Sequence, residues 1–325
     1  MTFNSIFSLN NIIETKYNSR FSVAEKNKPS WPENATHGYV CGGSIQSGPE
    51  TGGQTDVIRI NLNTETVSFF PNILPEDKDL PTAGVFSLTH GYIVGADNIF
   101  NPSIITKLQF SNETVVDVPY ASDSKPNDPA GVSASDYGYV IGRLNSQRIE
   151  FANDTNSTWL PGLIELRLSA STRSHISGYF GGGDDLDNDY LNTVFKVNFS
   201  DETFFDSGAN LPSGIEQTTG VSGTNYGYYC GGRIVDFPFY TSQIARLDFS
   251  NETVSSLGNL LPSVRSGSSG IDRGNYGYIC GGEDISPDDR TNQIAKFDFI
   301  NETVSVSSST LPTPVLLATG LNGVK

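Results

Sequence analysis

The chain has 325 residues, with 36 Asp and Glu against 20 Lys and Arg, which gives a formal net charge of −16. A chain this acidic is unsuited to wrapping nucleic acid or lying on an anionic membrane, and no apolar run approaches the ~20 residues of a membrane span. Only 17% of the residues are charged, while 33 are Gly, 19 Phe and 14 Tyr, a composition typical of short strands joined by tight turns.

Residues 1–36 stand outside the repeats that fill the rest of the chain. They begin without a cationic segment or a continuous apolar block, so they lack the pattern of a secretory signal. Phe3, Ile6, Phe7 and Leu9 lie close together, which is too apolar for a solvated tail, yet the segment is too short to build its own core. We expect an extension that buries these side chains on the rest of its own chain or on a neighbouring subunit.

From residue 37 onward the chain repeats itself. The pair Gly-Tyr occurs six times, at steps of 53, 47, 40, 49 and 50 residues, and a period of this size predicts a propeller or a solenoid. The pairs begin at Gly38, Gly91, Gly138, Gly178, Gly227 and Gly277.

The fifth repeat shows one whole unit, which we interpret as a blade of four short antiparallel strands. Residues 244–249 place Arg246 and Asp248 opposite Leu247 and Phe249, as in a half-buried strand, and "SNET" follows as a tight turn. The innermost strand of a blade is crowded by its neighbours and therefore needs small residues. A Gly stands seven residues before the Gly-Tyr pair in four repeats, as Gly84, Gly131, Gly220 and Gly270.

The C-terminus repeats the innermost strand without a blade to follow it. "LPTPVLLATGLNGVK" copies "LPSVRSGSSGIDRGN", with Gly320 in the place of Gly270, while the first repeat has no obvious innermost strand before Gly38. We therefore predict an all-β fold, a six-bladed β-propeller over residues 37–325. In it a strand within 313–323 pairs with the strand beginning near Gly38 and closes the ring.

The order of a double Gly, an aliphatic strand, a polar turn and "LP" resembles the kelch repeat over roughly residues 37–325. The sequence departs from kelch where a Trp usually follows the turn, because Phe204, Val254 and Val304 stand there. Repeats two and three also lack the double Gly, reading "GYIVGA" and "GYVIGR".

The unit "YGY-CGG…DFSNETVS…LP" is similar, more narrowly, to kelch-type proteins of marine tailed phages. That resemblance implies a virion protein made in the host cytoplasm. Its partners would be other virion proteins, held through the arm 1–36, and a host-surface glycan or protein.

Seven Asn residues begin an Asn-x-Ser/Thr sequence, the acceptor pattern for glycosylation. Three of them, Asn112, Asn251 and Asn301, hold one repeat position in the turn between the two outer strands. Their short side chains suit a tight turn, so we interpret them as turn residues without sugar.

The three cysteines, Cys41, Cys230 and Cys280, also hold one repeat position. Equivalent positions on separate blades are too far apart to form a disulfide, and an odd count with no C-x-x-C spacing argues against structural zinc. We expect buried free thiols.

No set of residues indicates catalysis. His37, His90 and His175 fall in different repeats, so they cannot converge on a metal, and no pair of carboxylates stands out as acid and base. The copper site of kelch-like sugar oxidases would need two His and a Tyr beside a reactive Cys, and no such set is found. We expect no enzyme activity and no cofactor.

Asp185, Asp187 and Asp189 occupy alternate positions of one loop, a spacing that can gather oxygen ligands for calcium. The loop lacks the glycine and the distal Glu of an EF-hand, since Lys196 stands in the place of that Glu. We interpret them as solvated loop acids that bind calcium weakly, if at all.

Alternate connections of an antiparallel blade emerge on opposite faces. One face carries short uniform turns, and the other carries loops of variable length, where function usually resides. The repeat-five loop places Phe237, Phe239 and Tyr240 around Pro238 as candidate binding residues, or as rings that fold onto the blade edge.

Taken with the resemblance, these features predict a non-enzymatic virion structural or accessory protein of a tailed phage. Its propeller would serve protein–protein attachment or host-surface recognition. A cytoplasmic kelch-type interaction adaptor stays open as an alternative, and a carbohydrate-active propeller enzyme is the third.

Overall fold

The computed structural model describes ten stretches of the chain, namely residues 35–47, 50–75, 82–95, 105–118, 126–143, 145–159, 166–185, 187–236, 239–284 and 290–324. The chain divides into two units, Met1–Trp31 and Pro32–Lys325, and the second contains all the described residues. The extension predicted for residues 1–36, with its apolar side chains, therefore lies outside the described residues except for Ala35 and Thr36.

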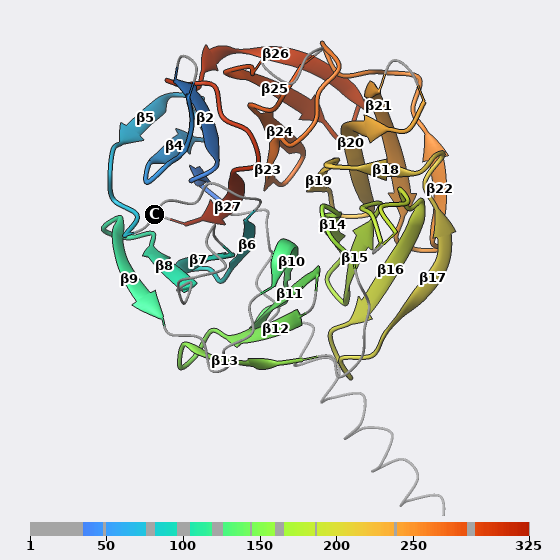
Figure 1. Ribbon diagram of the computed structural model, residues 1–325, viewed down its shortest axis with the longest axis horizontal. Coiled ribbons are helices and arrows are strands. Elements are labelled where there is room, and N and C mark those ends of the chain that lie inside the picture. Colours follow the sequence, from blue (N-terminus) through green and yellow to red (C-terminus); the bar gives the residue numbers. More distant parts are fainter. Residues whose placement is uncertain are drawn as a thin grey trace, which may run out of the picture. The chain divides into compact units, whose positions relative to one another are not determined.

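The fold is all-β, and the described residues contain no helix. Six antiparallel sheets follow one another around a ring, each with its strands stacked from the axis outward (Figure 1). The prediction of a six-bladed propeller with four-stranded blades is confirmed.

The strands of each blade run from the axis outward as follows. Blade one has β27 (Thr319–Gly323), β1 (His37–Cys41), β4 (Val57–Asn61) and β5 (Val67–Phe70). Blade two has β6 (Ala83–Phe86), β7 (His90–Val94), β8 (Ile105–Gln109) and β9 (Thr114–Val118). Blade three has β10 (Asn127–Ser133), β11 (Tyr137–Arg143), β12 (Asn145–Glu150) and β13 (Thr155–Thr158).

The second half of the ring continues in the same order. Blade four has β14 (Ala170–Arg173), β15 (Ser177–Gly181), β16 (Thr193–Asn198) and β17 (Phe204–Asn210). Blade five has β19 (Thr219–Ser222), β20 (Tyr226–Ile234), β21 (Tyr240–Asp248) and β22 (Thr253–Ser256). Blade six has β23 (Ser269–Arg273), β24 (Tyr276–Cys280), β25 (Gln293–Asp298) and β26 (Thr303–Thr310).

Blade one takes its innermost strand from the C-terminus. β27 pairs with β1 in antiparallel register from His37↔Gly323 to Cys41↔Thr319. An isolated bridge joins Ser44, which lies just beyond β1, to Leu316, which lies just before β27. The two segments therefore stay side by side there without a continuous strand pairing. The predicted ring closure is confirmed, with a strand shorter than the predicted 313–323.

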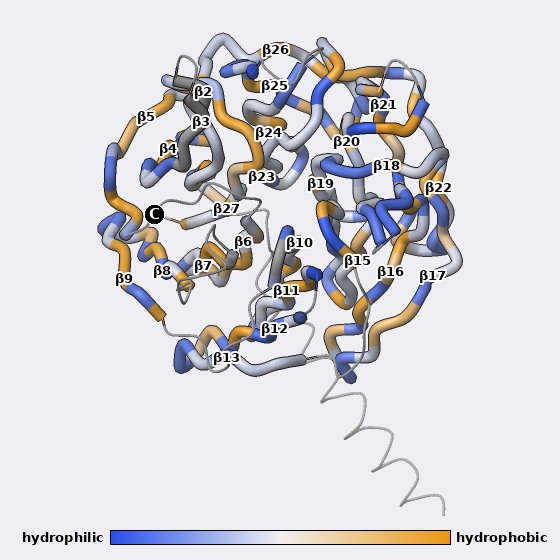
Figure 2. The backbone as a smooth tube through the Cα atoms, in the orientation of Figure 1, coloured by the Kyte–Doolittle hydropathy of each residue, from blue (hydrophilic) through white to orange (hydrophobic). Residues whose placement is uncertain are grey.

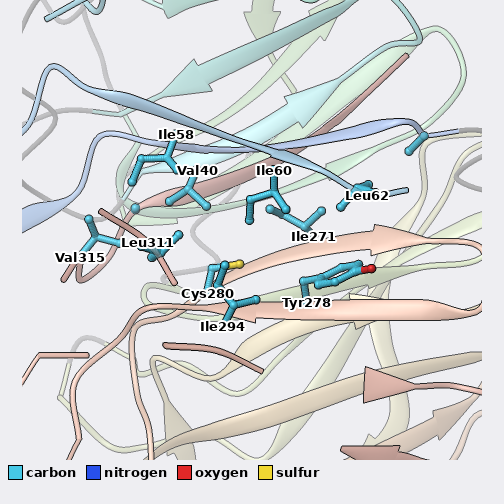
Figure 3. Packing of buried hydrophobic residues seen from close by; sticks show 12 residues of the cluster. Val40, Ile58, Ile60, Leu62, Ile271, Tyr278, Cys280, Ile294, Leu311 and Val315 are labelled. Atoms are coloured by element: carbon cyan, nitrogen blue, oxygen red, sulfur yellow. The ribbon is translucent and has the colours of Figure 1, made fainter. Parts of the chain in front are cut away.

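Apolar side chains pack chiefly between neighbouring blades. Figure 2 shows apolar segments in every blade rather than in one central mass. At the boundary that closes the ring, Ile58 and Ile60 of blade one meet Ile271, Tyr278 and Ile294 of blade six in one buried cluster (Figure 3). Each blade therefore gains its core from the next, and an open ring would expose two apolar faces.

The innermost strands approach one another most closely at a ring of glycines, which we call the glycine ring. A Cβ atom on Gly270 would lie 2.2 Å from the carbonyl oxygen of Gly220, and one on Gly320 would lie 2.0 Å from that of Gly270. Blade four has Ser171 at this position, and its hydroxyl donates a hydrogen bond to the carbonyl of Gly131. The ring consists of Gly84, Gly131, Ser171, Gly220, Gly270 and Gly320.

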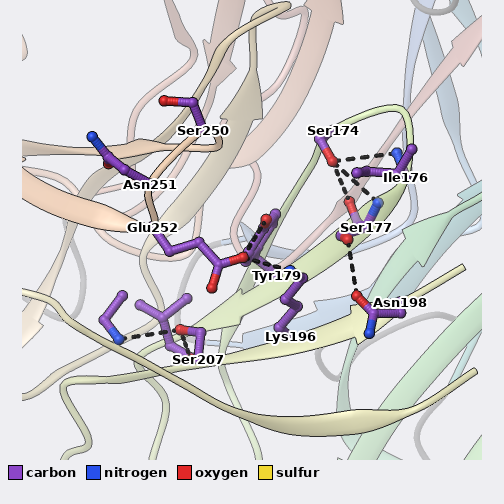
Figure 4. Close-up of polar contacts among 12 residues, drawn as sticks. Ser174, Ile176, Ser177, Tyr179, Lys196, Asn198, Ser207, Ser250, Asn251 and Glu252 are labelled. Atoms are coloured by element: carbon purple, nitrogen blue, oxygen red, sulfur yellow. Dashed lines mark hydrogen bonds and ion pairs between the residues drawn. The ribbon is translucent and has the colours of Figure 1, made fainter.

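A second repeated interaction, which we call the inter-blade clasp, joins each blade to the next. The Tyr of each Gly-Tyr pair is buried, and its hydroxyl donates to an acid in the outer turn of the following blade; a Lys or Arg on the third strand pairs with the same acid. Figure 4 shows one clasp, in which Tyr179 and Lys196 of blade four hold Glu252 of blade five, with a Tyr hydroxyl–carboxylate distance of 3.2 Å.

The clasp occurs at all six boundaries, including the one that closes the ring. Its members are Tyr39, Arg59 and Glu113; Tyr92, Lys107 and Asp154; Tyr139, Arg148 and Glu202; Tyr179, Lys196 and Glu252; Tyr228, Arg246 and Glu302; and Tyr278, Lys296 and Glu65. The hydrogen bond from Lys296 holds the pKa of Glu65 below its usual value, although burial opposes this. The native state therefore favours the charged carboxylate.

The turn that carries the acid is built by the residues around it. All six acids have positive φ, between 51° and 59°, which L residues adopt only when the surroundings fix them. Asn251 Oδ1 accepts hydrogen bonds from the backbone N–H of Thr253 at 3.0 Å and from its hydroxyl at 2.7 Å, and Asn112 makes the same two bonds to Thr114. The prediction that the Asn residues stabilise the turn is confirmed for Asn112 and Asn251. Asn301 holds the same position but instead donates its side-chain amide to Asp298 at 2.9 Å.

We expect the closest approach of the glycine ring, at Gly270, to tolerate no side chain. Gly270→Ala should lower the free energy of unfolding by about 3 kcal/mol or more, because its methyl group meets backbone rather than a flexible side chain. Gly258→Ala is the matched control, since a Cβ there meets nothing within 4 Å, and its effect should stay within about 1 kcal/mol. Chemical denaturation of both variants measures this, and equal stabilities would contradict it.

Deleting the last twelve residues, which removes β27, should abolish cooperative melting and cause aggregation, because blade one loses its innermost strand and two sheet edges open. Deleting only Val324 and Lys325 leaves β27 intact and serves as the control. A truncated chain that melts as the full chain does would show that the closure is dispensable.

Candidate functional site on the loop face and along the axis

We call the face that carries the variable connections the loop face, and two β-hairpins rise from it. β20 and β21 are each nine residues long, and their extra pairs Gly232↔Thr241 and Arg233↔Tyr240 carry the connection beyond the blade. In blade one, β2 (Ser44–Ser47) pairs with β3 (Glu50–Gly53) as a separate hairpin. Blade five also has a short extra strand, β18 (Ile215–Glu216), which pairs with β20.

The three aromatic candidates of the repeat-five loop are placed differently. Phe237 lies outside the described residues. Phe239 is 51% exposed with φ 65°, and its carbonyl accepts a hydrogen bond from the N–H of Ile234 at 2.8 Å, so the hairpin holds its backbone. Tyr240 is buried, with the guanidinium of Arg233 5.8 Å from its ring centre. Phe239 is thus exposed to solvent, while Tyr240 is buried beside Arg233.

Tyr240 belongs to a polar network that crosses from blade to blade. Glu216 accepts a hydrogen bond from the Tyr190 hydroxyl at 2.9 Å and pairs with Arg233 at 3.1 Å. Burial raises the pKa of Glu216, against the opposing influence of these two partners. Burial and the nearby Glu283 likewise raise the pKa of Tyr240, which extends the network to blade six.

The network continues into blades three and four. Arg167 Nε donates to Asp184 at 2.6 Å, a guanidinium nitrogen of Arg167 lies 4.0 Å from Asp128, and another donates to Asn188. Asp184 is almost fully buried and Arg167 is its counter-charge. Arg167 and Asp184 thus pair within blade four, and the contact of Arg167 with Asp128 joins that blade to blade three.

The acidic loop of blade four does not gather its three carboxylates. Asp185 Oδ1 accepts hydrogen bonds from the backbone N–H of Asp187 at 3.0 Å and of Asp189 at 2.9 Å. Asp185 therefore closes its own loop. Across the described parts of the chain, no group of three or more His, Cys, Asp or Glu residues is placed to hold a metal ion.

The cysteines are free and buried, as predicted. Burial raises the pKa of the Cys280 thiol to about 12 and raises those of Cys41 and Cys230 as well. Because only the thiolate is a nucleophile, these residues act as small apolar side chains. Two of the histidines bond to the preceding residue, His37 to Thr36 and His90 to Thr89, each within its own blade.

The axis holds two cavities that meet at the glycine ring. The one away from the loop face, of about 60 Å³, is lined by Arg173 and Asp272, both buried. Arg173 lies 4.8 Å from the ring centre of Phe86 and donates to the carbonyl of Ser133 at 3.2 Å; Asp272 accepts the N–H of Ser222 at 2.8 Å. Burial lowers the pKa of Arg173 to about 9 and raises that of Asp272 to about 6, with the attraction between them opposing both shifts.

Sequence reasoning missed this charged pair and the network around Glu216. The signal for the pair was available, because Arg173 and Asp272 stand two residues after the glycine-ring position, where other blades have Ser133, Ser222 or Asn322. No repeat position marks Glu216 in the same way, because its partners Tyr190 and Arg233 come from loops that differ in length between repeats.

Asp272 should make stability pH-dependent. Its native pKa is raised from 3.8 to about 6, so the native state holds the proton longer, and its contribution to stability should fall by on the order of 3 kcal/mol as pH rises from about 4 to 7. Asp272→Asn should remove that fall from the pH profile of unfolding free energy, relative to the natural chain. Parallel profiles for the two proteins would contradict it.

Calcium should have little effect on the fold. Because Asp185 is already used by its own loop, 10 mM calcium should raise the melting temperature by no more than ~2 °C. Asp187→Asn is the matched variant. A rise of many degrees that this substitution abolishes would establish a calcium site.

Among the described residues no helix has the length and apolarity to cross a membrane. A scan against protein-family models finds no match to the chain, and a search of curated proteins finds none either. The function has to follow from the geometry of the propeller and its loop face.

Proposed function

We propose that this protein is a non-enzymatic interaction module that presents its loop face to a partner. A propeller suits protein–protein interaction, because its blades form a rigid scaffold and its loops can vary. The observation that carries the proposal is the blade-five hairpin, in which Phe239 is exposed while its neighbour Tyr240 is buried and contacts Arg233.

The described part of the hairpin favours binding because contacts within the chain hold its backbone. An exposed aromatic ring on a braced backbone loses little conformational freedom when a partner covers it, and such rings often dominate binding energy. Arg233 and Glu216 hold the base of the hairpin, since Arg233 pairs directly with both Tyr240 and Glu216. The partner therefore meets a preformed surface.

The same network supports a non-enzymatic function. Its most buried acids, Asp184 and Glu216, each pair with an Arg across a loop, and neither lines one of the two axial cavities. Asp272 does line one of them, but it accepts the N–H of Ser222, and that cavity of about 60 Å³ is well below the ~150 Å³ that holds benzene in another protein. A general acid or base would need to reach a substrate in a cavity. A carbohydrate-active propeller enzyme is the least supported of the alternatives.

We further propose that the propeller is a virion component of a tailed phage, made in the host cytoplasm. The similarity of its repeats to kelch-type proteins of marine tailed phages supports this. Residues 1–36, through Phe3, Ile6, Phe7 and Leu9, would anchor it to another virion protein. The loop face would then point outward to a host-surface glycan or protein. The alternative, a cytoplasmic kelch-type adaptor, would bind its partner through the same face, but in the cytoplasm and not on a virion.

A mass-spectrometric inventory of purified particles separates these locations. Finding the chain in the particles supports the virion proposal, and its absence from them favours the adaptor. A chain that starts at Trp31 should fold and melt normally but fail to join the particle, and normal incorporation would contradict the anchor.

The loop face is tested by Phe239→Asp. Particles carrying this variant should adsorb to host cells at least several-fold more weakly, with an unchanged melting temperature. Phe205→Asp is the matched control, because Phe205 is a similarly exposed ring, 41%, on the outer strand β17 of blade four. Equal adsorption of both variants would overturn the assignment of the loop face.

A further inference from the structure

The peptide bond between Asp128 and Pro129 lies at an irregular point of β10, the innermost strand of blade three. Asp128 has φ 48°, in the left-handed region, although a residue before proline is normally restricted to extended backbone. The pairing of β10 with β11 shifts register between Asn127 and Ala130, around this bond. The sequence contains Asp-Pro at this one place. A strained backbone thus coincides with the dipeptide whose bond is generally the most labile in acid.

The repeat does not require Asp-Pro here. In four other blades the equivalent residue also has positive φ, but it is neither Asp nor followed by Pro. Each of the four donates its backbone N–H to the carbonyl of the equivalent residue in the preceding blade, at 2.7–2.9 Å. These residues are Leu168 (53°), Gln217 (51°), Gly267 (60°) and Leu317 (57°). The ring therefore fixes the shape of this turn, and the chemistry of Asp-Pro is an addition to it.

The surroundings of the bond favour attack on its carbonyl carbon. The carbonyl oxygen of Asp128 accepts the backbone N–H of Leu168 at 2.9 Å, and such a donor stabilises the negative charge that the oxygen gains under attack. The Asp128 side chain is 15% exposed. Pro129 lines the axial cavity on the loop-face side, whose volume of about 130 Å³ has room for water.

We propose that the Asp128–Pro129 bond is a self-cleavage site that acts at mildly acidic pH. A carboxyl oxygen of Asp128 bonds to the carbonyl carbon of the same residue and closes a five-membered anhydride. The C–N bond to Pro129 breaks, and the carboxyl proton passes to the proline nitrogen. Water then opens the anhydride. The products are residues 1–128, ending in Asp, and residues 129–325, beginning with Pro.

The charged groups around Asp128 set the pH range of the reaction. They are Arg167 and Asp184 of blade four and Arg143 of β11. Burial raises the pKa of the Asp128 carboxyl, Asp184 adds to the rise, and the two Arg residues oppose it. The carboxyl therefore takes up its proton at a higher pH than an ordinary Asp, and cleavage should become faster as pH falls toward 5.

Cleavage should leave the ring assembled. The cut lies between blades two and three, where the clasp of Tyr92, Lys107 and Asp154 and a buried apolar cluster join the two fragments. At the other end of the ring, β27 of the second fragment pairs with β1 of the first. The cut protein should elute in size exclusion as the natural chain does and separate into two pieces only on denaturation.

Intact-mass spectrometry on the full chain at 37 °C tests the proposal. One sample stands at pH 7.5, a second at the lowest pH at which circular dichroism shows a folded chain, and a third at that same low pH in 6 M urea. The second should yield fragments 1–128 and 129–325 at least about tenfold faster than either of the others, because unfolding removes the strain and the Leu168 donor.

Two variants take residues that other blades carry at the same positions, so they suit the fold. Asp128→Leu, as at Leu168, removes the attacking carboxyl and should abolish cleavage, and Pro129→Ser, as at Ser169, should slow it at least about tenfold because the leaving nitrogen is less basic. Asp117→Leu, at an exposed acid on β9, is the control and should cleave as the natural chain does.

A folded chain that stays intact for two weeks at the low pH would overturn the proposal. Equal rates in the folded and urea-unfolded samples would also overturn it, since they would show only the ordinary acid lability of an Asp-Pro bond. That comparison uses the natural chain alone, so it decides the matter even where a variant fails to fold.

Discussion

The rest of the fold depends on the inter-blade clasp. A propeller blade cannot bury both faces of its sheet alone, and the six boundaries must be nearly alike for the ring to close. At each boundary a buried Tyr and a Lys or Arg from one blade hold an acid from the next. The acidic residue itself has a positive φ, and this gives the outer turn the shape that points its carboxylate at the neighbouring blade. One repeated interaction thus fixes the distance and the angle between blades, and the loop face inherits its rigidity from it.

The ring architecture was predictable because its causes are local and repeat along the sequence. The Gly-Tyr pairs mark the second strands, and the glycines before them mark positions where only backbone fits, as the 2.2 Å approach at Gly270 shows. The C-terminal copy of the same pattern predicted the pairing of β27 with β1. The clasp was overlooked although its residues are visible in the sequence. The third strand of each blade carries a Lys or Arg, as at Arg246 and Lys296, and the turn that follows carries an acid, as at Glu252 and Glu302. Sequence reasoning assigned the turn its Ser, Asn and Thr and left the acid unused.

The candidate site was less predictable, for a physical reason. The repeat-five loop was identified by its aromatic residues, but the sequence could not tell that Phe239 is exposed and Tyr240 buried. The difference arises from the pairing of Arg233 with Tyr240 and Glu216, which come from separate segments. The axial cavity on the loop-face side of the glycine ring is likewise a product of the ring, because its lining comes from all six blades.

A double-mutant cycle on Lys196→Met and Glu252→Gln tests the clasp most directly. The two groups are partly buried, with side-chain exposures of 17% and 24%, and lie on different blades. If the clasp holds the ring, the unfolding free energies of the single and double variants should give a coupling energy of at least about 1 kcal/mol, above that of most exposed ion pairs. Single effects that add to within about 0.3 kcal/mol would show that the pair is incidental and that packing alone joins the blades.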